Sequence, residues 1–324
     1  MVYTHTSANK FEGMVCAPFT PYTGDGELNL AMIPDYAAFL RENGISGVFV
    51  NGSSGEGLLL TEDERRLTAE AWAKECGADL RLIVHVAAGS VRNCASLAAH
   101  AQDLGAFAIS AIGPTFPPLA KVAQLGAYCA EIAKAAPDLP FYYYHIPALS
   151  RVDLPMLDLL DFARQHIPNF AGIKYTSTDL HDLTRCTRYD NRRYDILAGL
   201  DETMLGAMAV ANSCGFIGGT FNYCAPIYSR LIEAFRAGDL ELARSLQEKS
   251  QDIIEVLIKY NGNMVAGKQM MRLVGLDLGG ARTPLAPMPA GDFERMADDL
   301  YEAGFFDHCN TLGGVRQHHT AQAV

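Results

Sequence analysis

The chain has 324 residues, 49% of them apolar, so it can bury a large core in one big domain with additions or in two ordinary domains. Its net charge of −11, without a basic stripe, makes nucleic acids and anionic membrane surfaces poor partners. No apolar run approaches the roughly 18–20 residues of a membrane-spanning helix, and the polar start lacks a signal-peptide core, so we expect a soluble, cytoplasmic protein.

Short apolar segments alternate with helical patterns through the first two thirds of the chain. The predicted strands are Gly13–Phe19, Val48–Val50, Leu82–Val86, Phe107–Ile112, Phe141–Tyr144, Ala171–Lys174, Ile196–Ala198 and Phe216–Gly218. The predicted helices between them are Leu28–Glu42, Thr61–Cys76, Val91–Leu104, Lys121–Ala135, Leu154–His166, Asp179–Thr187 and Glu202–Ala211. The second of these helices starts with a capping-box pattern, Thr61 followed by Glu64.

Eight strand–helix units within about 220 residues predict a closed (β/α)₈ barrel, the TIM barrel. The strands are short apolar runs without alternation, as expected for a parallel sheet covered by helices. An open doubly wound sheet is disfavoured because no G-x-G-x-x-G motif follows the first strand.

Three further helical segments follow the barrel: Leu240–Tyr260, Met264–Val274 and Gly291–Ala303. We therefore divide the chain into an N-terminal arm (1–12), the barrel (13–235), a C-terminal helical extension (236–309) and a loose tail (310–324) that contains His318 and His319.

The eight cysteines are scattered and include no C-x-x-C pair, which in a large cytoplasmic chain favours free thiols over disulfides or a zinc site. The nine histidines show no metal-ligand spacing. We therefore expect no metal.

The stretch Phe170–Thr178 reads F-A-G-I-K-Y-T-S-T, and its apolar run ends in a single lysine, Lys174. An unpaired ammonium in a core is costly, but a lysine at the last strand position can point out of the end of a barrel while partly desolvated. Desolvation favours the neutral amine, which attacks a ketone to form a Schiff base. The alternative from this stretch alone is a lysine whose amine reaches solvent at a strand end.

The loop after the second strand, Asn51–Gly57, reads N-G-S-S-G-E-G. Its glycines let backbone N–H groups turn inward, and Ser53 and Ser54 add donors, so the loop suits a small anion such as a carboxylate. The alternative is an ordinary Ser/Gly turn before the next helix.

Two other strand ends carry polar side chains on the same rim, because reacting groups in a (β/α)₈ barrel lie at the carboxyl ends of the strands. Tyr144 serves either packing or proton transfer. Asp201 and Glu202 either hydrogen-bond a polyhydroxylated substrate or cap the helix that starts there.

Five motifs occur in the order and spacing of one family: G-S-S-G-E-G, Y-Y-H-I-P-A-L-S, G-I-K-Y-T, G-L-D-E and G-G-T-F-N. Over roughly residues 11–305 the chain resembles the N-acetylneuraminate lyase / dihydrodipicolinate synthase family of Schiff-base (class I) aldolases. The synthase branch typically has an arginine soon after the proline of the second motif, and a tyrosine after strand four that reaches a neighbouring subunit. Here Ala-Leu-Ser follows Pro147, and the segment 113–118 contains no tyrosine, so the chain is similar to the lyase branch.

The resemblance implies a division of roles. Lys174 would form the Schiff base with the ketone of a 2-keto acid, and Tyr144 would handle the proton on the hydroxyl beside the bond that breaks. Ser53 and Ser54 would hold the carboxylate. The positions expected at the sugar are Thr176, Gly199, Asp201, Glu202 and Gly219. The implied reaction cleaves N-acetylneuraminate into pyruvate and N-acetylmannosamine, without a cofactor, in a homotetramer.

Two positions depart from the lyase pattern. Leu200 stands where bacterial members often have an aromatic residue, and Gly219 where lyases commonly have a serine whose hydroxyl helps hold the sugar tail. We therefore expect Gly219→Ser to lower the KM for N-acetylneuraminate without much change in kcat.

Three alternative functions stay open. The first is another pyruvate-dependent aldolase or dehydratase of the family, acting on a different 2-keto sugar acid. The second, dihydrodipicolinate synthesis, is disfavoured by the missing arginine. The third is a non-catalytic sugar-acid-binding barrel, which the presence of Lys174 and Tyr144 disfavours.

Overall fold

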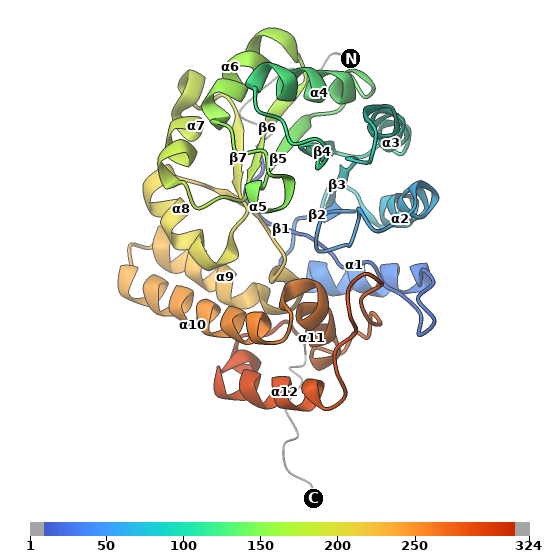
Figure 1. Ribbon diagram of the computed structural model, residues 1–324. Coiled ribbons are helices and arrows are strands. Elements are labelled where there is room, and N and C mark those ends of the chain that lie inside the picture. The colour runs from blue at the N-terminus through green and yellow to red at the C-terminus, as the bar shows by residue number, and fades with distance from the viewer. Residues whose placement is uncertain (1–9, 315–324) are drawn as a thin grey trace, which may run out of the picture.

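Eight parallel strands pair in chain order, and the first closes the ring on the last. The structure, a computed structural model, describes residues 10–314 (Figure 1). The strands are β1 (Gly13–Cys16), β2 (Gly47–Val50), β3 (Arg81–His85), β4 (Ala108–Ile112), β5 (Phe141–His145), β6 (Phe170–Tyr175), β7 (Asp195–Ala198) and β8 (Gly215–Gly218). Almost every strand residue is buried, because side chains fill the barrel interior and helices cover its outside. The predicted TIM barrel is confirmed.

Helices connect the strands around the outside of the ring (Figure 1). They are α1 (Ile33–Glu42), α2 (Glu62–Glu75), α3 (Val91–Asp103), α4 (Val122–Lys134), α5 (Pro147–Ser150), α6 (Met156–His166), α7 (Leu180–Arg192), α8 (Met204–Ala211) and α9 (Phe221–Arg236). The short α5 and the long α9 were not predicted. Pro226 lies inside α9 and Cys224 departs from helical geometry, so the helical pattern of this segment is interrupted.

The predicted capping box starts α2. Thr61 Oγ1 accepts a hydrogen bond from the Glu64 N–H (3.2 Å), and Glu64 Oε2 accepts one from the Thr61 N–H (2.8 Å). Such a cap contributes about 0.5–2 kcal/mol to helix stability. It fixes the start of the helix that follows the loop Asn51–Gly57.

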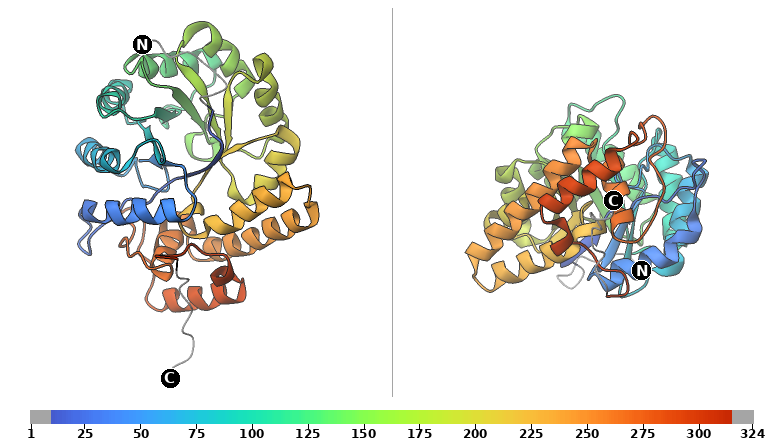
Figure 2. Two further views of the ribbon diagram at one scale, coloured as in Figure 1. Left: turned by 180° about the vertical axis from the view of Figure 1, so that it is seen from behind. Right: turned by 90° about the horizontal axis from the view of Figure 1, so that it is seen from below.

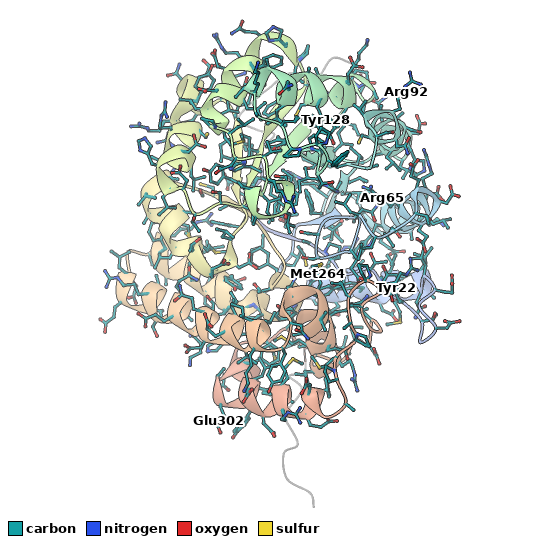
Figure 3. All side chains as sticks on the ribbon, in the orientation of Figure 1. Tyr22, Arg65, Arg92, Tyr128, Met264 and Glu302 are labelled. Carbon is teal, nitrogen blue, oxygen red and sulfur yellow. The ribbon has the colours of Figure 1, made fainter. Side chains whose placement is uncertain are left out.

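The C-terminal extension consists of α10 (Leu240–Lys259), a π-helical turn (Asn263–Gly267), α11 (Lys268–Leu273) and α12 (Asp292–Glu302). Helix α10 lies alongside α9, and α12 packs farther from the barrel (Figures 1 and 2). Between α10 and α12 the chain returns to the strand ends. Met264, labelled in Figure 3, lines a cavity there together with Ser53 and Tyr144. The extension therefore contributes to the opening of the barrel.

The predicted start of the tail at residue 310 is wrong, because Asn310 is fully buried. Its side chain accepts a hydrogen bond from the Ala225 N–H (2.7 Å) and donates to the Phe221 carbonyl oxygen (3.2 Å). The Thr311 N–H donates to Asn43 Oδ1 (2.9 Å), so the chain stays packed past the predicted boundary. Residues 1–9 of the arm and 315–324 of the tail, with both histidines of the tail, lie outside the described residues.

Within residues 10–314 no helix is long and apolar enough to cross a membrane.

Candidate active site

A cavity of about 240 Å³ lies at the carboxyl ends of the strands, and all the site residues predicted from the sequence line it. These residues are Ser53, Ser54, Tyr144, Lys174, Thr176, Gly199, Asp201, Glu202 and Gly219. They come from the ends of β2, β5, β6, β7 and β8, as the barrel topology requires. The structure brings them together; the role of each stays a prediction.

The register between β5 and β6 sets Lys174 opposite Tyr144. Phe141 pairs with Phe170, but the next residue of β5 pairs with Gly172, so one residue of β6 is skipped. Without this bulge Tyr144 would face Ile173, one position earlier. Bulges re-aim side chains near active sites, and here the bulge places the amine and the phenol on the same face of neighbouring strands.

Gly172 permits a close approach of β6 to its other neighbour, β7. A Cβ atom at position 172 would lie 1.8 Å from the Asp195 carbonyl oxygen of β7, far inside van der Waals contact. Only glycine lets β6 and β7 approach this closely. The glycine of the G-I-K-Y-T motif therefore fixes the backbone from which Lys174 projects.

Lys174 is 3% exposed, and its amine lies between two aromatic rings. Its Nζ is 4.1 Å from the ring centroid of Tyr144 and 4.2 Å from that of Phe49. In the described part of the chain no carboxylate comes within the 4.0 Å of a salt bridge with this amine. The amine thus borders a cavity without a carboxylate partner, the setting in which a carbonyl carbon can reach it.

Tyr144 is also 3% exposed, and its hydroxyl lies 3.1 Å from Ser53 Oγ. Either oxygen can donate, so a proton can pass between them. Phe49 and His85 meet the tyrosine ring edge to face, at centroid distances of 5.5 Å and 6.0 Å. These rings hold the phenol in place.

His85, one of the two rings that pack against Tyr144, has a neutral imidazole. Its Nε2 accepts from the Ile112 N–H (3.2 Å), so Nδ1 carries the proton and donates to the Asn51 carbonyl oxygen (3.0 Å). Burial lowers the pKa of His85 well below its ordinary value, and the charges of Arg65 and Lys174 act in the same direction. The imidazole therefore links the loop after β2 to the end of β4.

The sugar side of the predicted site contains an unpaired hydroxyl. Thr176 Oγ1 is buried and has no hydrogen-bond partner among residues 10–314. A Cβ atom at Gly199 would lie 2.1 Å from it, so the glycine makes room for the threonine. A buried hydroxyl without a partner beside a cavity is available to a ligand.

The two predicted acidic residues differ. Asp201 Oδ2 accepts from the Thr220 N–H (2.9 Å) and hydroxyl (2.7 Å), which ties the loop after β7 to the loop after β8. Burial raises the pKa of Asp201, and these bonds oppose the rise. Burial also raises the pKa of Glu202, whose side chain is less enclosed. Neither side chain caps the following helix, which removes that alternative.

The C-terminal extension also contributes to the cavity, which was not predicted from the sequence. Ile254, Leu257, Ile258, Gly262 and Asn263 line the same cavity. Asn263 Nδ2 donates to Ser54 Oγ (3.1 Å). A single asparagine in an N-G-N-M turn after a helix carries no sequence signal of a binding site.

The extension also holds the loop Asn51–Gly57 through a buried ion pair. Glu56 Oε1 lies 3.0 Å from Lys268 Nζ, and both side chains are fully buried. Glu56 Oε2 accepts from the Arg282 N–H (2.9 Å). The loop that carries Ser53 and Ser54 is therefore clamped from outside the barrel.

No three His, Cys, Asp or Glu side chains of the described chain gather where they could hold a metal ion.

The sequence matches the model of the dihydrodipicolinate synthetase family over residues 10–303. It is 38% identical over 296 residues to the N-acetylneuraminate lyase of Danio rerio, covering 90% of this chain and 96% of the relative. It is 39% identical over 281 residues to the N-acetylneuraminate lyase of Homo sapiens, covering 85% of this chain and 87% of the relative. Among solved structures, the Proteus mirabilis N-acetylneuraminate lyase superposes with a TM-score of 0.88 at 37% identity, covering 91% of this chain and 99% of the other.

Proposed function

The chain belongs to the dihydrodipicolinate synthetase family, and we propose that within it the protein is a class I aldolase that cleaves N-acetylneuraminate into pyruvate and N-acetylmannosamine. The observation that carries the chemistry is the buried Lys174 amine beside the Tyr144–Ser53 pair, at the wall of one cavity. The identity of about 38% to curated lyases supports the substrate.

The first step forms the imine. The neutral Lys174 amine attacks the ketone carbon of the open-chain sugar acid, and loss of water leaves a protonated imine. Ser53 and Ser54 hold the carboxylate next to that carbon, which fixes the keto acid with its ketone at the amine. The aromatic rings of Phe49 and Tyr144 exclude water from one side of the amine.

The second step breaks the carbon–carbon bond. Tyr144 takes the proton from the hydroxyl on the sugar-side carbon of that bond, and Ser53, 3.1 Å away, can relay it. The electrons of the broken bond flow to the imine nitrogen and leave an enamine, while the sugar part departs as an aldehyde. The enamine then gains a proton on carbon, and water releases pyruvate from Lys174 and restores the amine.

Assay of pyruvate release across a panel of 2-keto sugar acids tests the proposal. We expect N-acetylneuraminate to be cleaved, and we expect condensation of pyruvate with aspartate semialdehyde to be negligible because no arginine follows Pro147. Efficient condensation together with inert N-acetylneuraminate would contradict the lyase assignment. Gly219 favours one alternative, a lyase for a sugar acid with a different tail, which the same panel detects.

Assembly as a homotetramer and a cytoplasmic location complete the proposal. Exposed apolar side chains at Leu58 (50%) and Phe116 (87%), in the loops after β2 and β4, and at Leu149 (49%) in α5 support an interface on that side of the barrel. Analytical ultracentrifugation tests the tetramer, and a monomer at micromolar concentration would refute it. Cell fractionation tests the location.

A further inference from the structure

Asn263 occupies the space that a side chain at position 219 would need. A Cβ atom built on Gly219 would lie 2.5 Å from Asn263 Nδ2 and 3.1 Å from Ser54 Oγ. Gly219 therefore has a structural role beyond the absence of a serine hydroxyl. It makes room for an amide that enters the cavity from the C-terminal extension.

Two hydrogen bonds fix the orientation of this amide. The Tyr223 hydroxyl, itself fully buried, donates to Asn263 Oδ1 (2.9 Å), and Asn263 Nδ2 donates to Ser54 Oγ (3.1 Å). Because a carboxamide nitrogen carries two hydrogens, one donor remains after the bond to Ser54. Asn263 and Gly219 both line the cavity, so this second N–H is the donor that the amide can offer to a ligand there.

We propose that Asn263 is a substrate-binding and specificity-determining residue, whose carboxamide donates a hydrogen bond to an acceptor oxygen of the sugar acid beyond its pyruvyl part. This inference rests on the proposed function. It assigns to the extension the task that the sequence analysis expected of a hydroxyl at position 219. An amide reaches into the cavity from a different direction, so the pair Gly219 and Asn263 selects the tail of the sugar acid.

The geometry reverses one expectation from the sequence. Gly219→Ser alone cannot add a hydroxyl without displacing the Asn263 amide, since a 2.5 Å approach is one that real Cβ atoms essentially never show. We therefore expect this substitution to raise the KM for N-acetylneuraminate.

The test is a set of variants assayed with N-acetylneuraminate and, in the condensation direction, with pyruvate and N-acetylmannosamine. Asn263→Ala should raise the KM for both sugars by about threefold to tenfold, the value of one neutral hydrogen bond, with little change in kcat. Asn263→Asp keeps the acceptor for Tyr223 but loses both N–H donors and adds a charge, so it should raise these KM values at least as much. The KM for pyruvate in Asn263→Ala should change less than about threefold.

The double variant Gly219→Ser/Asn263→Ala is the most discriminating variant of the set. Removing the amide opens the space beside position 219, and the serine hydroxyl then supplies a donor there. The KM for N-acetylneuraminate should return toward the wild-type value although each single substitution raises it, a non-additivity expected only of residues that share one place. Asn261→Gly is the matched control, because Asn261 is an exposed amide of the same turn with a φ of 70° that glycine adopts freely, and it should leave all KM values unchanged.

Three results would overturn the inference: unchanged KM values in Asn263→Ala, additive effects in the double variant, or equal losses for pyruvate and for the sugars. The last would mean that Asn263 acts only through Ser54. Each of these leaves the proposed function standing if the wild type releases pyruvate from N-acetylneuraminate. If the wild type cleaves another acid of the panel instead, the proposed substrate is wrong, and the KM values of the same variants are measured with that acid. If the wild type cleaves no acid of the panel, both the proposed function and this inference are wrong.

Discussion

Two buried lysines, Lys174 in the barrel and Lys268 in the extension, lie against aromatic rings but in different surroundings. Lys174 Nζ is 4.1 Å from the Tyr144 ring centroid, and Lys268 Nζ is 3.9 Å from that of Tyr22. Figure 3 labels Tyr22 on the side of the molecule where the extension meets α1. The closest carboxylates differ: Lys268 has Glu56 at 3.0 Å, whereas Lys174 has no carboxylate within salt-bridge distance in residues 10–314.

The difference shows what identifies a nucleophilic amine. Burial lowers the pKa of Lys268 to about 8, although Glu56 opposes the shift, so a search for lowered lysine pKa values would nominate this lysine. Lys268 lines neither the cavity that contains Lys174 nor the neighbouring cavity that Met264 lines with Ser53 and Tyr144, and its amine is held by a carboxylate. Lys174 lines the cavity with Tyr144 and Ser53. If the proposed function holds, access for a ketone makes Lys174, and not Lys268, the reactive lysine.

The largest effect is expected from removing the reactive amine. Lys174→Ala should abolish pyruvate release, because no imine can form, while its far-ultraviolet circular dichroism stays that of the wild type. Folded Lys268→Met should keep measurable activity under the same assay. If Lys174→Ala retains turnover and Lys268→Met loses it, the two lysines have been assigned in reverse.

Tyr144→Phe should reduce kcat by about 10²–10⁴-fold, because it removes the proton-transfer hydroxyl and keeps the ring that packs against Lys174. Imine formation with pyruvate should partly survive, which borohydride trapping measures. Phe49→Leu serves as the matched control, since Phe49 is the other ring beside the amine and has no proton to transfer. A loss of less than about threefold in Tyr144→Phe would reduce Tyr144 to packing.

Lys268→Met should act on stability instead. It leaves Glu56 buried without its cation, and breaking a buried pair in this way costs about 3–5 kcal/mol. The free energy of unfolding in urea measures the cost. Glu56→Gln/Lys268→Met removes both charges and should recover most of it; equal losses in the single and double variants would show that packing, not charge, matters here.

A smaller, pH-dependent effect follows from the same pair. The pKa of Lys268 is about 8 in the folded protein against an ordinary value of 10.5, so between these values the unfolded chain binds more protons. The free energy of unfolding of the wild type, relative to Glu56→Gln/Lys268→Met, should therefore rise by roughly 1–3 kcal/mol as the pH increases through this window. Urea titrations at pH 7.5 to 10.5 measure the difference, and a flat difference would contradict the shift.

Much of the barrel follows from local patterns. Strands of the predicted type and order appear because short apolar runs between amphipathic helices have few other parallel arrangements. Lys174 and Tyr144 could be placed on one rim from the sequence because each ends a strand. Their direct pairing could not, because it depends on a bulge at Ala171 that no local pattern marks.

The parts that the sequence analysis missed depend on long-range contacts. Asn263 and Ser54 lie far apart in the sequence and meet only because the extension folds back over the strand ends. The same holds for Lys268 with Glu56, and for Asn310 with Ala225. Each of these polar residues lies in a turn or helix whose local sequence does not indicate the partner.

Peptide mapping after reductive trapping tests the central claim most directly. The wild-type protein is treated with pyruvate and borohydride at pH 9, where a pKa of about 8 leaves most of Lys268 neutral and so gives the competing lysine its best chance. We predict a single reduced pyruvyl adduct on Lys174, with inactivation in proportion to labelling, and none on Lys268. An adduct on Lys268, or labelling that persists in Lys174→Ala, would contradict the account.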